Sequence, residues 1–223
     1  LGKAYVDRSK VSGEIQVTGL GEQNFTSDLI VWDGAFMAEH YDLKRAYINL
    51  ENDKTIIKNY LVSKGVAEER LVFSAVNFRE KTRSKYSPKG DFMGEEFVGY
   101  ELTQSVQIES NEVEKIEKIS REVTELLNQG VNFYSEAPRY YYTQLADLKI
   151  EMISKATEDA RIRAEKIAAY SNGELGALQS AKMGVFQITG QNSTENYSWG
   201  GTFNTSSRDK TASITMKLVY KVK

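Results

Sequence analysis

Residues 155–178 read KATEDARIRAEKIAAYSNGELGAL, and this stretch gives the strongest indication of how the chain folds. The helix that we predict through it, from residue 144 to residue 171, carries a row of alanines four residues apart: Ala156, Ala160, Ala164 and Ala168. A coiled coil would instead repeat bulky residues at a spacing of about 3.5. Because small side chains let a helix approach a flat partner closely, we predict that this helix packs against a β-sheet.

The charges of the same helix are balanced along its length. Between residues 151 and 166 it has four acidic and four basic side chains, several of them in opposite-charge pairs four residues apart, such as Asp159 with Arg163. Each pair of this kind adds only ~0.2–0.5 kcal/mol to helix stability. Nucleic-acid binding requires a basic stripe, which is absent here, so we interpret these charges as a solvated outer face.

The whole chain has a composition typical of a soluble globular protein. It has 223 residues, 40% hydrophobic and 27% charged, which suits one large domain or two small ones. The net charge of −2 provides no general field that would attract nucleic acid. There is no cysteine, which excludes disulfides, thiol catalysis and cysteine-based zinc sites. The single histidine, His40, has no acid or nucleophile indicated beside it, and we interpret it as a structural or surface residue.

The hydrophobic pattern predicts an α+β fold. Strands are expected at residues 13–22, 28–40, 70–78, 98–108, 175–189 (broken near Gly184) and 211–222, and helices at 42–64, 111–130 and 144–171. Two strand–helix–strand units stand in tandem, and their alternating strands favour mixed or antiparallel sheets with helices packed on one side.

Several local motifs refine this outline. Asn111 and Glu114 have the spacing of a capping box that opens the second helix. Gly19 and Gly21 form a G-x-G fragment without the third glycine of a dinucleotide site, so we expect a turn there. The polar segments 79–96 and 190–208 are predicted as loops, the second of them mobile.

One basic segment is a candidate anion-binding site. Its cations alternate along residues 79–85 and, in an extended chain, all point the same way: Arg79, Lys81, Arg83 and Lys85. Such a row is suited to a phosphate or polyanion. Nearby acidic residues dilute the field, among them Glu80 and Glu96. We therefore favour a solvated loop or a charged sheet edge, where charge prevents unwanted strand pairing.

One aromatic segment is a candidate contact surface. Residues 196–203 read NYSWGGTF and contain Tyr197, Trp199 and Phe203. Exposed aromatic side chains in a polar loop indicate an oligomer contact or a stacking site for sugars or bases. Of the two, we favour the oligomer contact.

These residues together resemble the SIMPL-domain family of bacterial envelope proteins. The resemblance begins with the DAR-x-x-AE-x-x-A…G-x-LG passage, here residues 159–176. It continues in VTGLGE (17–22), KGVAEERL (64–71), GYELTQSVQI (99–108), Gly130-Val131 and the closing strand. Trp32 and the run MGVFQI (183–188) resemble the branch with a single N-terminal membrane anchor.

The resemblance implies a SIMPL-like α+β domain over residues 14–223, with sub-units 14–96 and 97–223. It implies that residues 1–13 are a linker following a removed signal or membrane anchor, and that the domain is extracytoplasmic, either periplasmic or membrane-anchored and facing outward. Some members of the family assemble into large rings, and some are linked to oxidative-stress defence. The family has no established catalytic residues, cofactor or metal, so none is carried over.

Two functions follow as hypotheses. The first is a non-enzymatic cell-envelope protein that forms a homo-oligomer, is linked to envelope or oxidative stress, and binds no nucleic acid. The alternative is a polyanion- or glycan-binding module that uses residues 79–85 and 197–203. A hydrolase would instead need clustered carboxylates with raised pKa values lining a cleft.

Overall fold

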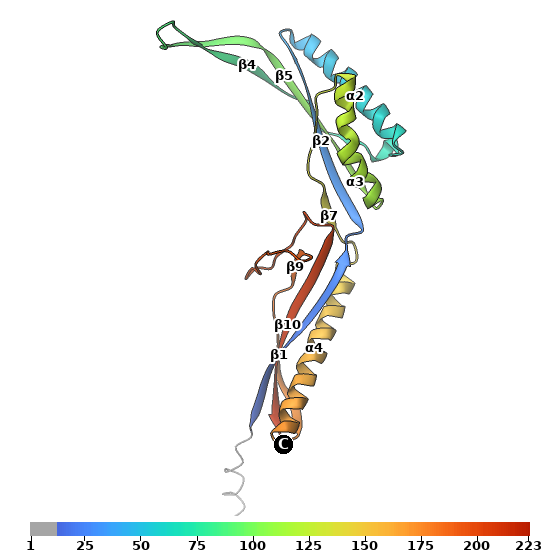
Figure 1. The fold of residues 1–223 in the computed structure, drawn as a ribbon, viewed down its shortest axis with the longest axis vertical. Helices are drawn as coiled ribbons and strands as arrows, with labels where there is room; N and C mark the ends of the chain where they lie inside the picture. Colours follow the sequence, from blue (N-terminus) through green and yellow to red (C-terminus); the bar gives the residue numbers. More distant parts are fainter. Residues whose placement is uncertain (1–12) are drawn as a thin grey trace, which may run out of the picture. The chain divides into compact units, whose positions relative to one another are not determined.

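The computed structural model describes residues 13–223, which fold into two compact units (Figure 1). One unit combines residues 13–27 with residues 142–223, and the other comprises residues 28–141. The α+β class is confirmed, with antiparallel sheets and three α-helices among the described residues. The division predicted between residues 96 and 97 does not coincide with these units, because it falls inside the continuous strand β5 (Phe92–Ser110).

The unit that contains both chain ends is one sheet covered by one helix. Its antiparallel strands lie in the order β1 (Glu14–Thr26), β10 (Asp209–Val222) and β8 (Leu175–Met183), and β9 (Gln187–Gly190) also pairs with β10. The β1–β10 register is unbroken from Glu14 opposite Lys221 to Thr26 opposite Asp209. Helix α4 (Leu145–Tyr170) covers one face of this sheet.

The alanine row of α4 lies against β1, which confirms the predicted helix–sheet contact. Ala156, Ala160, Ala164 and Ala168 are buried. Gly19 and Gly21 face the helix, and a Cβ atom on Gly19 would lie 2.4 Å from the backbone nitrogen of Ala160. The G-x-G fragment is therefore not the turn that we predicted, because it lies within β1 and makes room for the helix.

The other unit is a second antiparallel sheet with helices on one face (Figure 1). Its central strands are β2 (Leu29–His40) and β5, flanked by β3 (Val72–Phe73) and β4 (Asn77–Tyr86) on one side and by β6 (Phe133–Ser135) and β7 (Arg139–Tyr141) on the other. The helices are α2 (Leu43–Ser63) and α3 (Val113–Glu122), with 3-10 segments Glu68–Arg70 and Val123–Gln129.

Trp32 lies fully buried in the core of this second unit. Its indole Nε1 donates to the Ser135 hydroxyl at 3.0 Å, and that hydroxyl donates to the Ser120 carbonyl at 2.7 Å. Gly34 lies beneath the Phe133 ring, since a Cβ atom there would stand 2.0 Å from the ring. The tryptophan therefore ties β2 to β6 and to α3 while its polar atom is satisfied.

Two local predictions are wrong in this unit. Residues 79–96 are not a loop: β4 and β5 form a hairpin across them, with Arg83 opposite Glu96 and Tyr86 opposite Phe92. The polar side chains led us to predict a loop, because both faces of this hairpin are largely exposed to solvent. The capping box is also absent, because the Asn111 side chain donates to the Asp28 carbonyl at 2.9 Å instead of capping α3.

Within residues 13–223, no helix combines the length and apolar character that crossing a membrane requires. Residues 191–208 contain no strand or helix apart from an isolated bridge between Ile188 and Phe203. This irregular segment crosses beside β9 and β10 and carries the aromatic residues singled out above.

Candidate functional site

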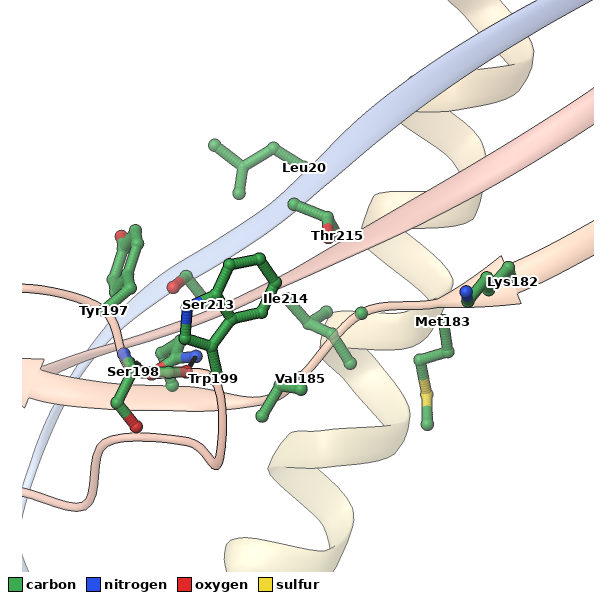
Figure 2. A pocket seen from close by; sticks show the side chains of 12 residues that line it. Leu20, Lys182, Met183, Val185, Tyr197, Ser198, Trp199, Ser213, Ile214 and Thr215 are labelled. Carbon is green, nitrogen blue, oxygen red and sulfur yellow. Dashed lines mark hydrogen bonds between the residues drawn. The ribbon is translucent and has the colours of Figure 1, made fainter.

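The candidate site is a cavity of about 660 Å³ beside the sheet of the first unit. Leu20 of β1 lines it on the sheet face opposite α4, because Gly19 and Gly21 on either side of Leu20 face the helix. Figure 2 shows Tyr197 and Trp199 from the irregular segment, Met183 from the end of β8, and Val185 from the connection between β8 and β9. We call this space the loop cavity.

The loop cavity is lined by apolar side chains together with a few polar groups. Leu20, Met183, Val185 and Tyr197 are each about half exposed or more, and Trp199 is fully exposed. Between them lie the hydroxyls of Ser213 and Thr215 and the ammonium of Lys182. A volume in this range, lined mainly by apolar groups with a few polar ones, suits the binding of a ligand or of a protruding side chain.

The segment that carries Trp199 is braced by the side chain of Gln187. The Gln187 carbonyl oxygen accepts from the Thr202 N–H at 2.7 Å, and its amide donates to the Ser198 carbonyl at 2.8 Å. Gln187 is buried, so these bonds are shielded from competing water. One β9 residue thus holds the chain on both sides of Trp199.

A second brace involves Glu195. Its carboxylate accepts from the Gly190 N–H at 2.7 Å and from the Asn204 amide at 2.6 Å. The Gly190 hydrogen bond, followed by that from Asn204, lowers the pKa of Glu195. Asn204 is buried and also accepts from the Ser207 N–H at 2.8 Å. The irregular segment is therefore a hydrogen-bonded platform, although it has no regular secondary structure.

Two of the three predicted aromatic residues meet at the loop cavity. Tyr197 and Trp199 line it, whereas Phe203 does not and instead bridges to Ile188. Sequence reasoning missed Leu20, Met183 and Val185, which come from two other places in the chain. Of these three residues, only Leu20 had a recognisable sequence signal, because it is apolar at an outward-facing position of an alternating strand.

The four predicted anion-binding cations lie on β4, and each is paired with a carboxylate. Arg79 contacts Glu101 at 2.8 Å, Lys81 contacts Glu39 at 2.6 Å, and Arg83 and Lys85 contact Glu96 at 3.2 and 3.5 Å. Arg79 lowers the pKa of Glu101, and Arg83 and then Lys85 lower that of Glu96. The segment is the charged sheet edge that we favoured, and its positive charge is locally neutralised.

A second cavity, of about 620 Å³, lies where α2 begins. Leu43 and Tyr47 of α2 face Val76, Phe78 and Leu102, with Asp42 and Lys44 at the rim. We call it the α2 cavity. The hairpin tip, formed by Tyr86, Phe92 and Met93, is a separate exposed apolar group. Sequence reasoning found neither, because both depend on the hairpin that it missed.

Two ionisable residues outside these surfaces, His40 and Lys210, have well-defined surroundings. His40 accepts from the Asp42 N–H at 2.9 Å through Nδ1, in the turn before α2. Lys210 is buried between β1 and β9, and burial lowers its pKa to about 8. In residues 13–223, no three His, Asp or Glu side chains are grouped as metal ligands would be.

Comparison with known protein families identifies the family of the chain. The family model named SIMPL, described as "Protein of unknown function (DUF541)", matches residues 15–218. That range runs through both compact units, from β1 to β10. No curated protein matches the chain.

Proposed function

Because the chain belongs to the SIMPL family, we propose that it is a non-enzymatic protein of the cell envelope whose function depends on self-association. The extracytoplasmic location follows the resemblance to the anchored branch of the family, and the absence of cysteine is compatible with an oxidising compartment. Fractionation of cells that express the full gene product tests the location. Recovery of the protein in the cytosol would contradict it.

The full exposure of Trp199 on a braced segment carries the proposal of self-association. Large aromatic side chains contribute strongly to protein interfaces, and a pre-ordered segment loses little conformational entropy when it binds. Gln187 and Glu195 hold the backbone around Trp199, so the exposed ring belongs to an ordered surface. Leu20 and Val185 beside it extend the apolar area available to a partner.

Sedimentation velocity over a wide range of protein concentration tests self-association. The intact chain is expected to sediment as a species larger than the monomer, and Trp199→Ala with Tyr197→Ala to shift the equilibrium toward monomer. Phe203→Ala is the matched control, because Phe203 is a half-exposed aromatic residue outside the loop cavity. A strict monomer at the highest concentration would contradict the proposal.

The alternative, a glycan-binding module, is favoured by one observation. The loop cavity combines aromatic rings with the hydroxyls of Ser213 and Thr215, which suits the mixed apolar and hydroxyl faces of a sugar. The polyanion form is less favoured, since each cation of residues 79–85 already has a carboxylate partner. Titration with soluble oligosaccharides and with heparin tests both forms. Polyanion binding should weaken steeply with salt, and the absence of binding to either would remove the alternative.

A further inference from the structure

The β4–β5 hairpin ends in a rigid apolar tip. Tyr86 and Phe92 face each other across the two strands with ring centroids 6.0 Å apart, and they are 64% and 61% exposed. The turn between them is closed by the Ser87 N–H, which donates to the Asp91 carbonyl at 2.8 Å. The Ser87 hydroxyl also accepts from the Asp91 N–H at 3.1 Å. The rings are therefore presented by an ordered turn.

The sides of the hairpin are polar near the turn, so the tip is its main apolar feature. Glu96 pairs with Arg83 and Lys85, and the Thr82 hydroxyl donates to Glu95 at 2.9 Å. The two cations, Arg83 and Lys85, and the two carboxylates, Glu95 and Glu96, therefore leave no net charge close to the turn. A partner approaching the end of the hairpin therefore meets aromatic rings beside a nearly neutral surface.

The α2 cavity has the complementary character. Its lining includes the buried Leu102 together with Leu43, Tyr47 and Phe78, which are partly exposed. Its rim carries one acid and one base, Asp42 and Lys44. The turn of the hairpin likewise carries one base and one acid, Lys89 and Asp91. Contact between the two surfaces therefore brings together no excess of like charge.

The hairpin tip cannot reach the α2 cavity of its own chain. Phe78 lines the cavity, and Tyr86 lies eight residues further along the same extended strand. At about 3.3 Å per residue, the strand places the tip roughly 26 Å from the cavity wall. Figure 1 shows the two strands running on beyond the start of α2 to a free turn. A tip and a cavity of this kind come together only between two molecules.

We propose that the hairpin tip of one molecule inserts into the α2 cavity of a second copy. The inference rests on the proposed self-association and adds a second contact, separate from the surface around Trp199. The contact is heterologous, because each copy donates a tip to one neighbour and offers a cavity to another. Two rings of roughly 200 Å² each, about 60% exposed, and the matching cavity walls bury roughly 500 Å² in total. That is below the ~1,200 Å² of a standard interface, so one contact alone is weak and association depends on concentration.

Complementation between two variants tests this contact. Phe92→Asp disables the tip and leaves the cavity intact. Leu43→Asp disables the cavity and leaves the tip intact, and an acid suits the first turn of α2. Tyr170→Asp is the matched control, because Tyr170 is an exposed aromatic residue elsewhere. Tyr86→Asp and Phe78→Ser serve as second tip and cavity variants, and circular dichroism verifies the fold of each.

Sedimentation velocity on each variant and on 1:1 mixtures gives the readout. We expect Phe92→Asp and Leu43→Asp to be at least tenfold weaker in self-association, Tyr170→Asp to behave as the parent chain, and the 1:1 mixture to associate more strongly than either variant alone. If the parent chain associates and the single variants associate equally well, or if their mixture associates no better than either variant alone, the tip-to-cavity contact is wrong while self-association stands. A monomeric parent chain would overturn both.

Discussion

Gly19 of β1 lies so close beneath α4 that a Cβ atom on it would stand 2.1 Å from the carbonyl oxygen of Ala156. Gly21 repeats the relationship one turn earlier, where a Cβ atom would stand 2.2 Å from the Met152 carbonyl. Backbone therefore packs on backbone, with alanines on the helix and glycines on the strand. The short distance also lets Asp159 accept a hydrogen bond from the Leu20 N–H at 2.8 Å.

Gly19→Ala is expected to destabilise the protein. The added methyl group would overlap the backbone of α4, which cannot move aside as a side chain does, so helix and strand must separate. We expect a loss of roughly 2–4 kcal/mol in the free energy of unfolding, measured by urea denaturation. Gly200→Ala is the control, because nothing lies within 4 Å of a Cβ atom there. Equal stability of the two variants would show that α4 does not pack on Gly19.

Asp159→Asn is expected to change how the free energy of unfolding depends on pH at acidic pH. The hydrogen bond from the Leu20 N–H, and then Arg163, lower the pKa of Asp159 below its ordinary 3.8. A lowered carboxyl pKa contributes stability that is present above pH 3.8 and lost as the pH falls through the folded pKa. The parent chain should therefore exceed the variant by roughly 1 kcal/mol at pH 6, since this carboxylate is partly exposed.

That difference should shrink as the pH falls below 3.8, because the carboxyl of the unfolded parent chain then binds a proton while that of the folded chain stays ionised until the pH reaches its lower pKa. Urea denaturation at a series of pH values from 2 to 6 measures it. Glu14→Gln is a suitable control, because Glu14 is an exposed carboxylate at the start of β1. A difference between parent and Asp159→Asn that stays constant down to pH 2 would contradict the assignment.

Gln187→Ala is expected to loosen the segment that carries Trp199. The substitution leaves the Thr202 N–H without its partner and takes one of two donors from the Ser198 carbonyl, which still accepts from the Gly201 N–H at 3.2 Å, at a cost of roughly 1–3 kcal/mol for local order. Limited proteolysis should then cleave within residues 191–203 several-fold faster than in the parent chain. Gln179→Ala is the control, because the exposed Gln179 amide makes only contacts of 3.4 Å. Equal cleavage rates in all three proteins would mean that Gln187 does not brace the segment.

Lys210 is expected to make the protein more stable as the pH rises from 8 to 10.5. Burial lowers its pKa to about 8, whereas the unfolded chain keeps a value near 10.5. Between these values the unfolded state holds a proton that the folded state has released, so the free energy of unfolding rises with pH.

Lys210→Gln should remove this rise, and Lys217→Gln, on an exposed position of the same strand, should keep it. Urea denaturation at pH 7.5, 9 and 10.5 gives the slopes. Losing the contacts of the Lys210 amine changes the free energy of unfolding by the same amount at every pH, so it does not affect the slope against pH. Parallel slopes for the parent chain and Lys210→Gln would contradict the lowered pKa.

The fold was predictable wherever a periodic pattern reports burial on one face. The alanine period placed α4 within one residue of its observed ends and indicated its sheet partner. The alternation of Ala212, Ile214 and Met216 likewise predicted the inward face of β10. The hairpin across residues 79–96 was not predicted, because β4 is exposed at every position and therefore has no apolar face that would produce an alternating pattern.

The candidate site was predictable only in part. Tyr197 and Trp199 stood out, because aromatic residues in a polar segment are unusual. Phe203 did not join them, since its bridge to Ile188 is a tertiary contact without a sequence signature. The pairing of Lys81 with Glu39 joins residues 42 positions apart, so no local pattern revealed that the cation was neutralised.

The family, the α+β class and the buried faces of α4 and β10 could all be read from the amino-acid sequence, because side-chain size and polarity at a fixed period set those faces. The three-dimensional fold was needed to show that Gly19 serves helix packing, that the cations of β4 are paired, and that Trp199 and the hairpin tip are held exposed on ordered backbone. Each of these depends on residues that are distant in the chain and adjacent in space, and short-range periodicity carries no information about such distances.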